Sequence, residues 1–146
     1  MSNASNASNV TQLKPSAPEI LVYVMVATSA ADGTMSDMEL KSIGSEVQSL
    51  PVFEALSDDE FMGAVRTCTT ILDDDDGLDT IIQMVGSLPV RLQETAYALA
   101  VDVAASDLSV APEEVRFLQL MRDGLQLDRL ATAAIERGAK ARFQTV

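Results

Sequence analysis

Hydrophobic positions along this chain recur every three to four residues, which is the spacing of α-helices with one buried face. No segment alternates apolar and polar residues over the length of a strand, so we expect no sheet. The pattern predicts an all-α bundle of about seven helices, over residues 17–31, 36–50, 57–72, 78–88, 89–105, 112–124 and 128–141. The first of these is apolar on nearly every side, and we expect it in the middle of the bundle.

Specific signals mark the start of the helical region and of two helices. Ser36 and Ser57 are each followed three residues later by a glutamate, the capping-box spacing that opens a helix. Residues 1–16 are rich in Ser, Asn and Ala, lack an apolar pattern and are predicted to be a disordered leader. The chain thus divides into that leader, one helical domain over 17–142 and a short tail over 143–146.

One segment of the chain occurs twice. Residues 21–43 resemble residues 96–118 at a constant offset of 75 positions, with an apolar run, an aspartate, six residues and a glutamate in each copy. The repeat predicts a duplicated helical hairpin in which the aspartate ends one helix and the glutamate begins the next. Packing the two hairpins together would bring four carboxylates to one site: Asp32, Glu39, Asp107 and Glu114.

These acids have two interpretations. In the first copy, Asp32 suits the turn and Glu39 can cap the helix together with Ser36, which stabilises the hairpin by about 1 kcal/mol. In the second copy Ala111 stands in the place of Ser36, so Glu114 lacks a hydroxyl partner and its presence favours another role. Capping stays open as an explanation, because the helix dipole favours any acid near a helix N-terminus.

Convergence of the four carboxylates would require a neutralising partner. Two carboxylates about 4 Å apart repel by about 4 kcal/mol at an effective dielectric constant of about 20. Protonation, the bases Lys41 and Arg116, or a bound cation could each relieve this repulsion. The chain has no histidine, and all-oxygen ligands favour Ca²⁺, Mg²⁺ or Mn²⁺ over Zn²⁺. The repeat therefore predicts a divalent-cation site.

The net charge of −12 makes some classes of binding partner unfavourable. A chain with this charge repels nucleic acid and anionic membrane surfaces, so we expect neither as a partner. Residues 54–79 hold nine acids and a single base, Arg66, whereas residues 129–142 hold four bases and a single acid, Glu136. This asymmetry supports an alternative function, an acidic helical interaction module without a metal site. Such a module would dock an unknown, basic protein partner or associate with itself as a homo-oligomer.

The apolar run over residues 20–31 is too short to be inserted across a membrane, which takes about 20 residues. It could instead be the apolar part of a secretion signal. Against this, its internal copy at 96–105 stands where no signal acts, and Glu19 stands where a basic flank is expected. The single cysteine, Cys68, excludes an internal disulfide and suits a reducing compartment, so we expect a cytoplasmic protein.

No catalytic constellation is visible in the sequence. With no histidine to serve as its base, Cys68 is predicted to lie in the core, and we expect a non-catalytic protein. Residues 73–77 fail the calcium-loop template, since Leu72 falls at its first ligand position and Gln83 at that of its bidentate glutamate. They are better explained as a solvated acidic loop. Four methionines are predicted to fill gaps on apolar helix faces: Met25, Met62, Met84 and Met121.

A family resemblance rests on the repeated motif. Residues 27–43 read ATSAADGTMSDMELKSI, and residues 107–118 echo them before a GLQLD sequence. In these motifs the chain resembles the tellurite-resistance TerB-like family, over roughly residues 17–140. The resemblance implies a compact, seven-helix, all-α domain with metal-binding acids at two helix bends, here Asp32, Glu39, Asp107 and Glu114. One position departs from the family's pattern, because Leu108 stands where a glycine is usual.

The resemblance also implies a role. Related domains occur in stress and tellurite-resistance gene clusters and as the acidic, helical portion of some DnaJ-type co-chaperones. It therefore implies a non-catalytic accessory protein of the stress or tellurite-resistance type.

Overall fold

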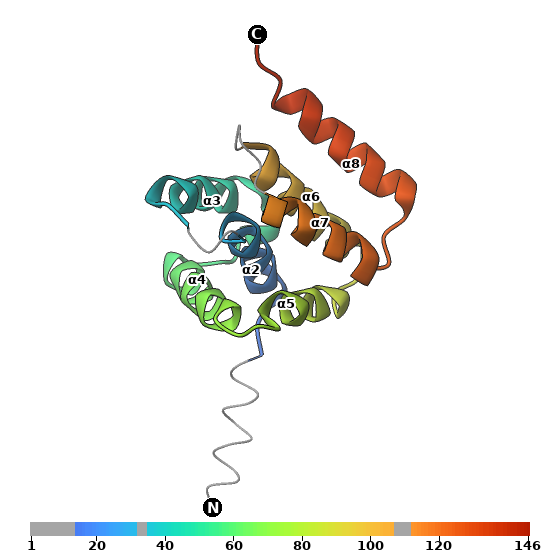
Figure 1. Ribbon diagram of the computed structural model, residues 1–146. Coiled ribbons are helices and arrows are strands. Elements are labelled where there is room, and N and C mark those ends of the chain that lie inside the picture. The colour runs from blue at the N-terminus through green and yellow to red at the C-terminus, as the bar shows by residue number, and fades with distance from the viewer. Residues whose placement is uncertain (1–13, 32–34, 107–111) are drawn as a thin grey trace, which may run out of the picture.

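The computed structural model describes residues 14–31, 35–106 and 112–146, and over these residues it contains helices and no strand (Figure 1). The elements are α2 (Ala17–Ser29), α3 (Asp37–Ser49), the short 3₁₀ helix η1 (Pro51–Phe53), α4 (Asp58–Leu72), α5 (Gly77–Gly86), α6 (Val90–Ser106), α7 (Pro112–Gly124) and α8 (Arg129–Arg142). The prediction of an all-α fold with seven α-helices is confirmed for the described residues. The predicted leader lies mostly outside them.

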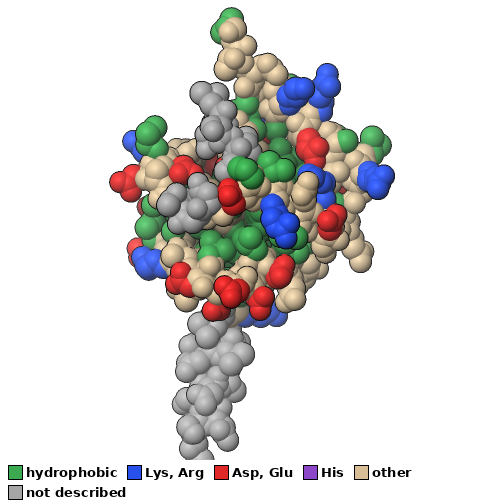
Figure 2. Space-filling view, in the orientation of Figure 1, with side chains coloured by type: hydrophobic (Ala, Val, Ile, Leu, Met, Phe, Trp, Pro, Cys, Tyr) green, Lys and Arg blue, Asp and Glu red, His purple; other side chains and the backbone are tan. Residues whose placement is uncertain are grey.

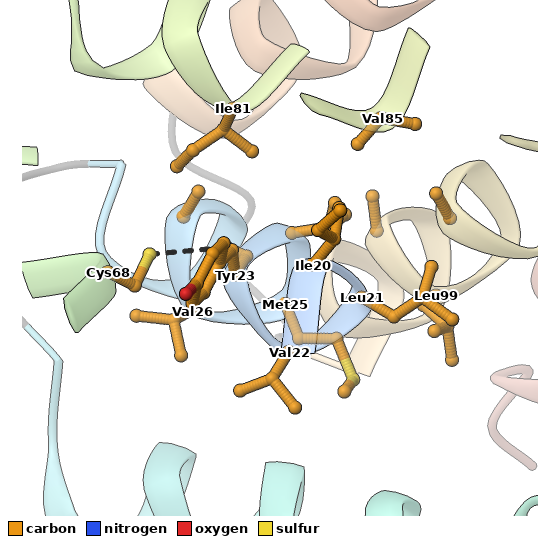
Figure 3. Packing of buried hydrophobic residues seen from close by; sticks show 14 of the residues in the cluster. Ile20, Leu21, Val22, Tyr23, Met25, Val26, Cys68, Ile81, Val85 and Leu99 are labelled. Atoms are coloured by element: carbon orange, nitrogen blue, oxygen red, sulfur yellow. Dashed lines mark hydrogen bonds between the residues drawn. The ribbon is translucent and has the colours of Figure 1, made fainter. Parts of the chain in front are cut away.

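Helix α2 forms the centre of the molecule. Every residue from Ile20 to Ser29 is buried, and α3, α4, α5, α6 and α7 all pack against this helix. Figure 3 shows Ile81 and Val85 of α5 on one side of it and Leu99 of α6 at one end. The prediction that the apolar helix lies in the middle is confirmed. No helix in the described part of the chain is both long and apolar enough to cross a membrane.

The lone cysteine lies in the core beside α2, as predicted. Cys68 is fully buried, and its thiol donates a hydrogen bond to the carbonyl oxygen of Tyr23 at 3.4 Å (Figure 3). Burial raises the pKa of this thiol to about 12. Met25 and Met121 are fully buried too, but Met62 is 38% exposed and does not fill a gap in the core.

Three helices begin with the same reciprocal cap. In each, a serine hydroxyl accepts a hydrogen bond from a glutamate N–H, and the glutamate carboxylate accepts one from the serine N–H. The pairs are Ser16–Glu19 in α2, Ser36–Glu39 in α3 and Ser57–Glu60 in α4. The two later caps were predicted from their spacing. Helix α7 begins and ends 75 positions after α3, which is the offset of the sequence repeat.

Helix α8 lies on the outside of the bundle and packs on α6 (Figure 1). Only Thr132 and Ala139 of this helix are buried. The end of α8 is joined to α6 by an ion pair between Arg142 and Asp102. Phe143, directly after the helix, remains 41% exposed. Few residues of α8 are therefore buried, and the Arg142–Asp102 ion pair holds its C-terminal end on α6.

The acidic run between α4 and α5 is a solvated connection. Residues 73–76 are exposed, while Gly77 is buried against the last turn of α4. A Cβ atom on Gly77 would lie 2.4 Å from the carbonyl oxygen of Ile71, which no side chain can tolerate. Glycine stands at this position because two helix ends approach closely.

Candidate cation site

Glu39 stands in the first turn of α3 and contacts the end of α2. One of its carboxylate oxygens accepts a hydrogen bond from the Ser36 N–H at 2.9 Å, and the other accepts one from the Ser29 hydroxyl at 3.0 Å. The first bond is the helix cap expected from the sequence. The second joins α2 to α3 through the same carboxylate, so Glu39 does more than cap its own helix.

Glu114 occupies the corresponding place in the first turn of α7, and it is buried. Its side chain is 6% exposed, whereas the neighbouring Glu113 and Arg116 are exposed. Burial of a carboxylate is costly unless nearby groups compensate its charge. Its place in the first turn of α7 supplies part of this compensation, because the helix dipole favours a negative charge there.

The two glutamates line one cavity of about 540 Å³. They reach it from the two copies of the sequence repeat, Glu39 on α3 and Glu114 on α7. Two further acids, Glu46 and Asp102, line the same cavity. The other lining residues are the hydroxyl-bearing Ser29, Ser36, Ser42 and Ser106 and the apolar Met38, Ile43, Val103 and Phe143. Carboxylate and hydroxyl oxygens therefore predominate among the polar groups of the cavity.

The two predicted aspartates, Asp32 and Asp107, lie outside the described residues. Asp107 follows Ser106 directly in the chain, and Ser106 lines the cavity. Among the residues that the structure does describe, no three acidic or cysteine side chains stand close enough together to hold a metal ion. A metal at this place would need ligands besides the described glutamates.

No protein-family model, no curated protein and no solved structure matches this chain. The TerB-like resemblance therefore rests on the sequence motifs alone.

The acids Glu46 and Asp102 at the cavity were not predicted. Burial raises the pKa of Glu46, and the negative charge of Asp102 raises it further, while Arg142 opposes the shift. Because Arg142 also pairs with Asp102, one guanidinium offsets both acids. The chain thus places one of its own cations beside two acids of the cavity, although Arg142 does not line it.

Two weak signals in the sequence could have revealed these acids. Glu46 lies seven positions after Glu39, so the two side chains share a face of α3. Asp102 interrupts an otherwise apolar run in α6. Neither acid has an acidic counterpart 75 positions away, where Met121 and Ala27 stand instead. Reasoning from the repeat could not find them.

The lining groups suit a hard cation. Carboxylates and hydroxyls are the ligands that Ca²⁺, Mg²⁺ and Mn²⁺ prefer, and no lining residue offers an imidazole or a thiolate for Zn²⁺. The same negative lining repels oxyanions. A cavity of this chemistry selects for positive charge.

Proposed function

We propose that this protein is a non-catalytic, divalent-cation-binding accessory protein of the TerB-like, stress or tellurite-resistance type, acting in the cytoplasm. In this proposal Asp32, Glu39, Asp107 and Glu114 supply the ligands. The observation that supports it most directly is that Glu39 and Glu114, 75 positions apart, line one cavity. Two acids at equivalent positions of a repeat are expected to serve a shared site when they reach the same space.

Electrostatics supports a cation over other ligands. Four described acids line the cavity, and the charge of Asp102 is near enough to Glu46 to raise its pKa. A divalent ion between such acids would turn their repulsion into attraction. Ca²⁺, Mg²⁺ and Mn²⁺ fit the oxygen donors better than Zn²⁺ does. The acidic cavity would repel tellurite, which is an anion. A role in tellurite resistance would therefore depend on cation binding or sensing.

Thermal unfolding of chelator-treated protein tests the proposal, with Ca²⁺, Mg²⁺, Mn²⁺ or Zn²⁺ added in separate experiments. A ligand at about 100 times its Kd stabilises the folded state by about 2.7 kcal/mol, which raises Tm by roughly 5–10 °C in a chain of this size. The Glu114→Gln variant should lose this increase. Its matched control is Glu113→Gln, which removes the same charge from an exposed neighbour, and the Asp32→Asn, Asp107→Asn double variant tests the remaining ligands.

A second comparison separates cation binding from helix capping. Glu39→Gln keeps an oxygen that can accept the Ser36 N–H but removes the charge, and Glu60→Gln makes the same change in an equivalent cap on α4 that does not line the cavity. Loss of the metal-dependent increase in Glu39→Gln alone supports the site. No increase in Tm with any ion, or an equal loss of that increase in both variants, would mean that the acid pairs only cap helices.

The second candidate function is an acidic helical interaction module without a metal site. The distribution of charge on the surface favours this function. In Figure 2, acidic side chains gather along the lower edge, where α4 and α5 lie in Figure 1, and most basic side chains lie toward α8. A module of this kind would show no cation-dependent change in Tm. The unfolding experiment therefore distinguishes the two functions.

A further inference from the structure

A second cavity of about 540 Å³ opens on another side of the molecule, between α3, η1 and α4. Helices α3 and α4 both pack on α2 but not closely on each other, which leaves a groove between them. Its lining residues are Gly44, Val47 and Gln48 of α3, Phe53 of η1, Glu54, Leu56 and Ser57 of the connection, and Asp58, Phe61 and Met62 of α4. None of these residues lines the candidate cation site.

The interior of this groove is apolar. Val47 and Phe53 are buried at 7% and 2% exposure, and Phe61 is only partly covered. Met62, which the sequence pattern predicts to fill a gap, is instead 38% exposed at the groove. A flexible, exposed methionine beside a partly covered phenylalanine is a surface that adapts to apolar side chains.

The charges that line the groove are all negative. Glu54 and Asp58 are its only charged lining residues, and the single bases of the two helices, Lys41 on α3 and Arg66 on α4, do not line it. With a net charge of −12, the whole chain attracts a cationic segment over a distance and repels a second copy of itself. Local and overall charge thus favour the same class of occupant.

We propose that the α3–α4 groove docks a basic segment of a partner protein. The segment would insert an apolar side chain between Phe53, Phe61 and Met62, and it would place Lys or Arg side chains beside Glu54 and Asp58. This mode combines an apolar anchor with charge pairing at the rim. It does not depend on the proposed cation site.

Gly44 allows the groove to be blocked without disturbing the fold. A Cβ atom at this position would lie 3.9 Å from Cε2 of Phe61, an ordinary van der Waals contact. In Gly44→Leu the Cβ atom therefore fits, and the rest of the side chain extends into the groove. Gly44→Ala adds only the Cβ atom and is the matched control.

The probe is a fluorescein-labelled synthetic peptide in which Leu and Phe alternate with Arg, and its counterpart has Glu in place of every Arg. Fluorescence anisotropy with the full chain should show salt-dependent binding of the Arg peptide and none of the Glu peptide. Gly44→Leu should weaken binding at least tenfold, and Gly44→Ala should leave it unchanged. No binding of the Arg peptide, or equal binding by both variants, overturns the proposal.

Charge variants test the rim separately. The Glu54→Gln, Asp58→Asn double variant should bind the Arg peptide more weakly than the Asp73→Asn, Asp74→Asn variant, which removes two charges from an exposed loop that does not line the groove. Equal losses would mean general attraction to an acidic protein and would overturn the proposal. Sedimentation velocity adds one outcome: a dimer that Gly44→Leu abolishes would assign the groove to a second copy and overturn the basic partner.

Discussion

The hydroxyl of Tyr97 on α6 donates a hydrogen bond to Oε2 of Glu136 on α8, at 2.5 Å. The same hydroxyl accepts a hydrogen bond from Arg122 on α7 at 2.7 Å, and Arg122 lies 3.3 Å from the Glu136 carboxylate. The Tyr97 ring is fully buried, while its two partners are partly exposed. Three consecutive helices are thus joined at one phenolic oxygen.

We expect Tyr97→Phe to destabilise the protein by about 1–2 kcal/mol. The change removes a donor to one charged group and an acceptor from another, and such hydrogen bonds contribute about 1.5–3 kcal/mol when desolvated. The value is lower here because water can reach both charged partners. Urea unfolding measures the change. In a double-mutant cycle with Glu136→Gln the two losses should be less than additive, and additive losses would contradict a shared contact.

The protein should lose stability as pH rises from about 9 to 12. Burial raises the pKa of Cys68 to about 12, and burial together with the Glu136 hydrogen bond raises the pKa of Tyr97 to about 12. In an unfolded chain the pKa of a cysteine thiol is about 8.5 and that of a tyrosine hydroxyl is about 10. The unfolded state therefore loses its protons first, so stability is complete below the unfolded values and falls as pH approaches the folded ones.

Urea unfolding at several pH values checks this expectation. For Cys68 the free energy of unfolding should fall by up to about 1.4 kcal/mol per pH unit within its window. Cys68→Ala should remove the loss that begins near pH 9. Tyr97→Phe should reduce the part that begins near pH 10, and Tyr23, whose pKa burial also raises, should account for the rest. A pH-independent stability of the wild type up to pH 11 would be the contrary result. The thiol should also react with Ellman's reagent only when the protein unfolds.

Gly77→Ala should destabilise the protein by about 2 kcal/mol or more. The added Cβ would meet the Ile71 carbonyl oxygen at 2.4 Å, and relief requires the ends of α4 and α5 to separate. Gly44→Ala provides the contrast, because its Cβ has room and alanine favours a helix interior over glycine by about 0.5–1 kcal/mol. Thermal unfolding should therefore show opposite changes in Tm. Equal changes would mean that the contact at Gly77 is not tight.

Arg142→Gln should tighten cation binding at the proposed site. Arg142 pairs with Asp102 and opposes the rise in the pKa of Glu46, and both acids line the cavity. Its removal therefore leaves these two acids without a neighbouring positive charge. We expect Kd for a divalent ion to fall by about two- to tenfold, the size of a single-charge effect at short range in a water-rich site. Isothermal titration calorimetry measures this change.

The control for this prediction is Arg137→Gln, which removes an exposed arginine from the same helix. It does not line the cavity. A tighter Kd in Arg142→Gln alone would show that the contact matters. Equal tightening in both variants would mean that only the net charge of the protein had changed.

The helices could be predicted because their signals are local. The Ser36–Glu39 and Ser57–Glu60 spacings predict helix caps, and the structure contains both. Pro112 begins α7 and Gly124 ends it, as the conformational preferences of proline and glycine predict. The central place of α2 follows equally from its composition. Each of these inferences needs only residues within one or two turns of one another.

The candidate site was less accessible from sequence because it is assembled across the chain. The repeat directs attention to Glu39 and Glu114, which line one cavity. Asp102 and Arg142 are 40 positions apart, and their pairing depends on how α8 packs on α6. A periodic pattern predicts which face of α8 is buried, but not which acid on another helix its arginine will reach.

The burial of α2 has a consequence for the synthesis of this protein. Residues 20–29 leave the ribosome before every helix that covers them, the last of which is α7. The main partners of this strongly apolar segment, α4 and α6, end at Leu72 and Ser106, so it stays only partly covered until both have emerged, and contacts over such separations form slowly. The native core can close only after α7, which ends at Gly124, has emerged. A nascent chain arrested before α7 should accordingly be held by general chaperones and digested readily by protease.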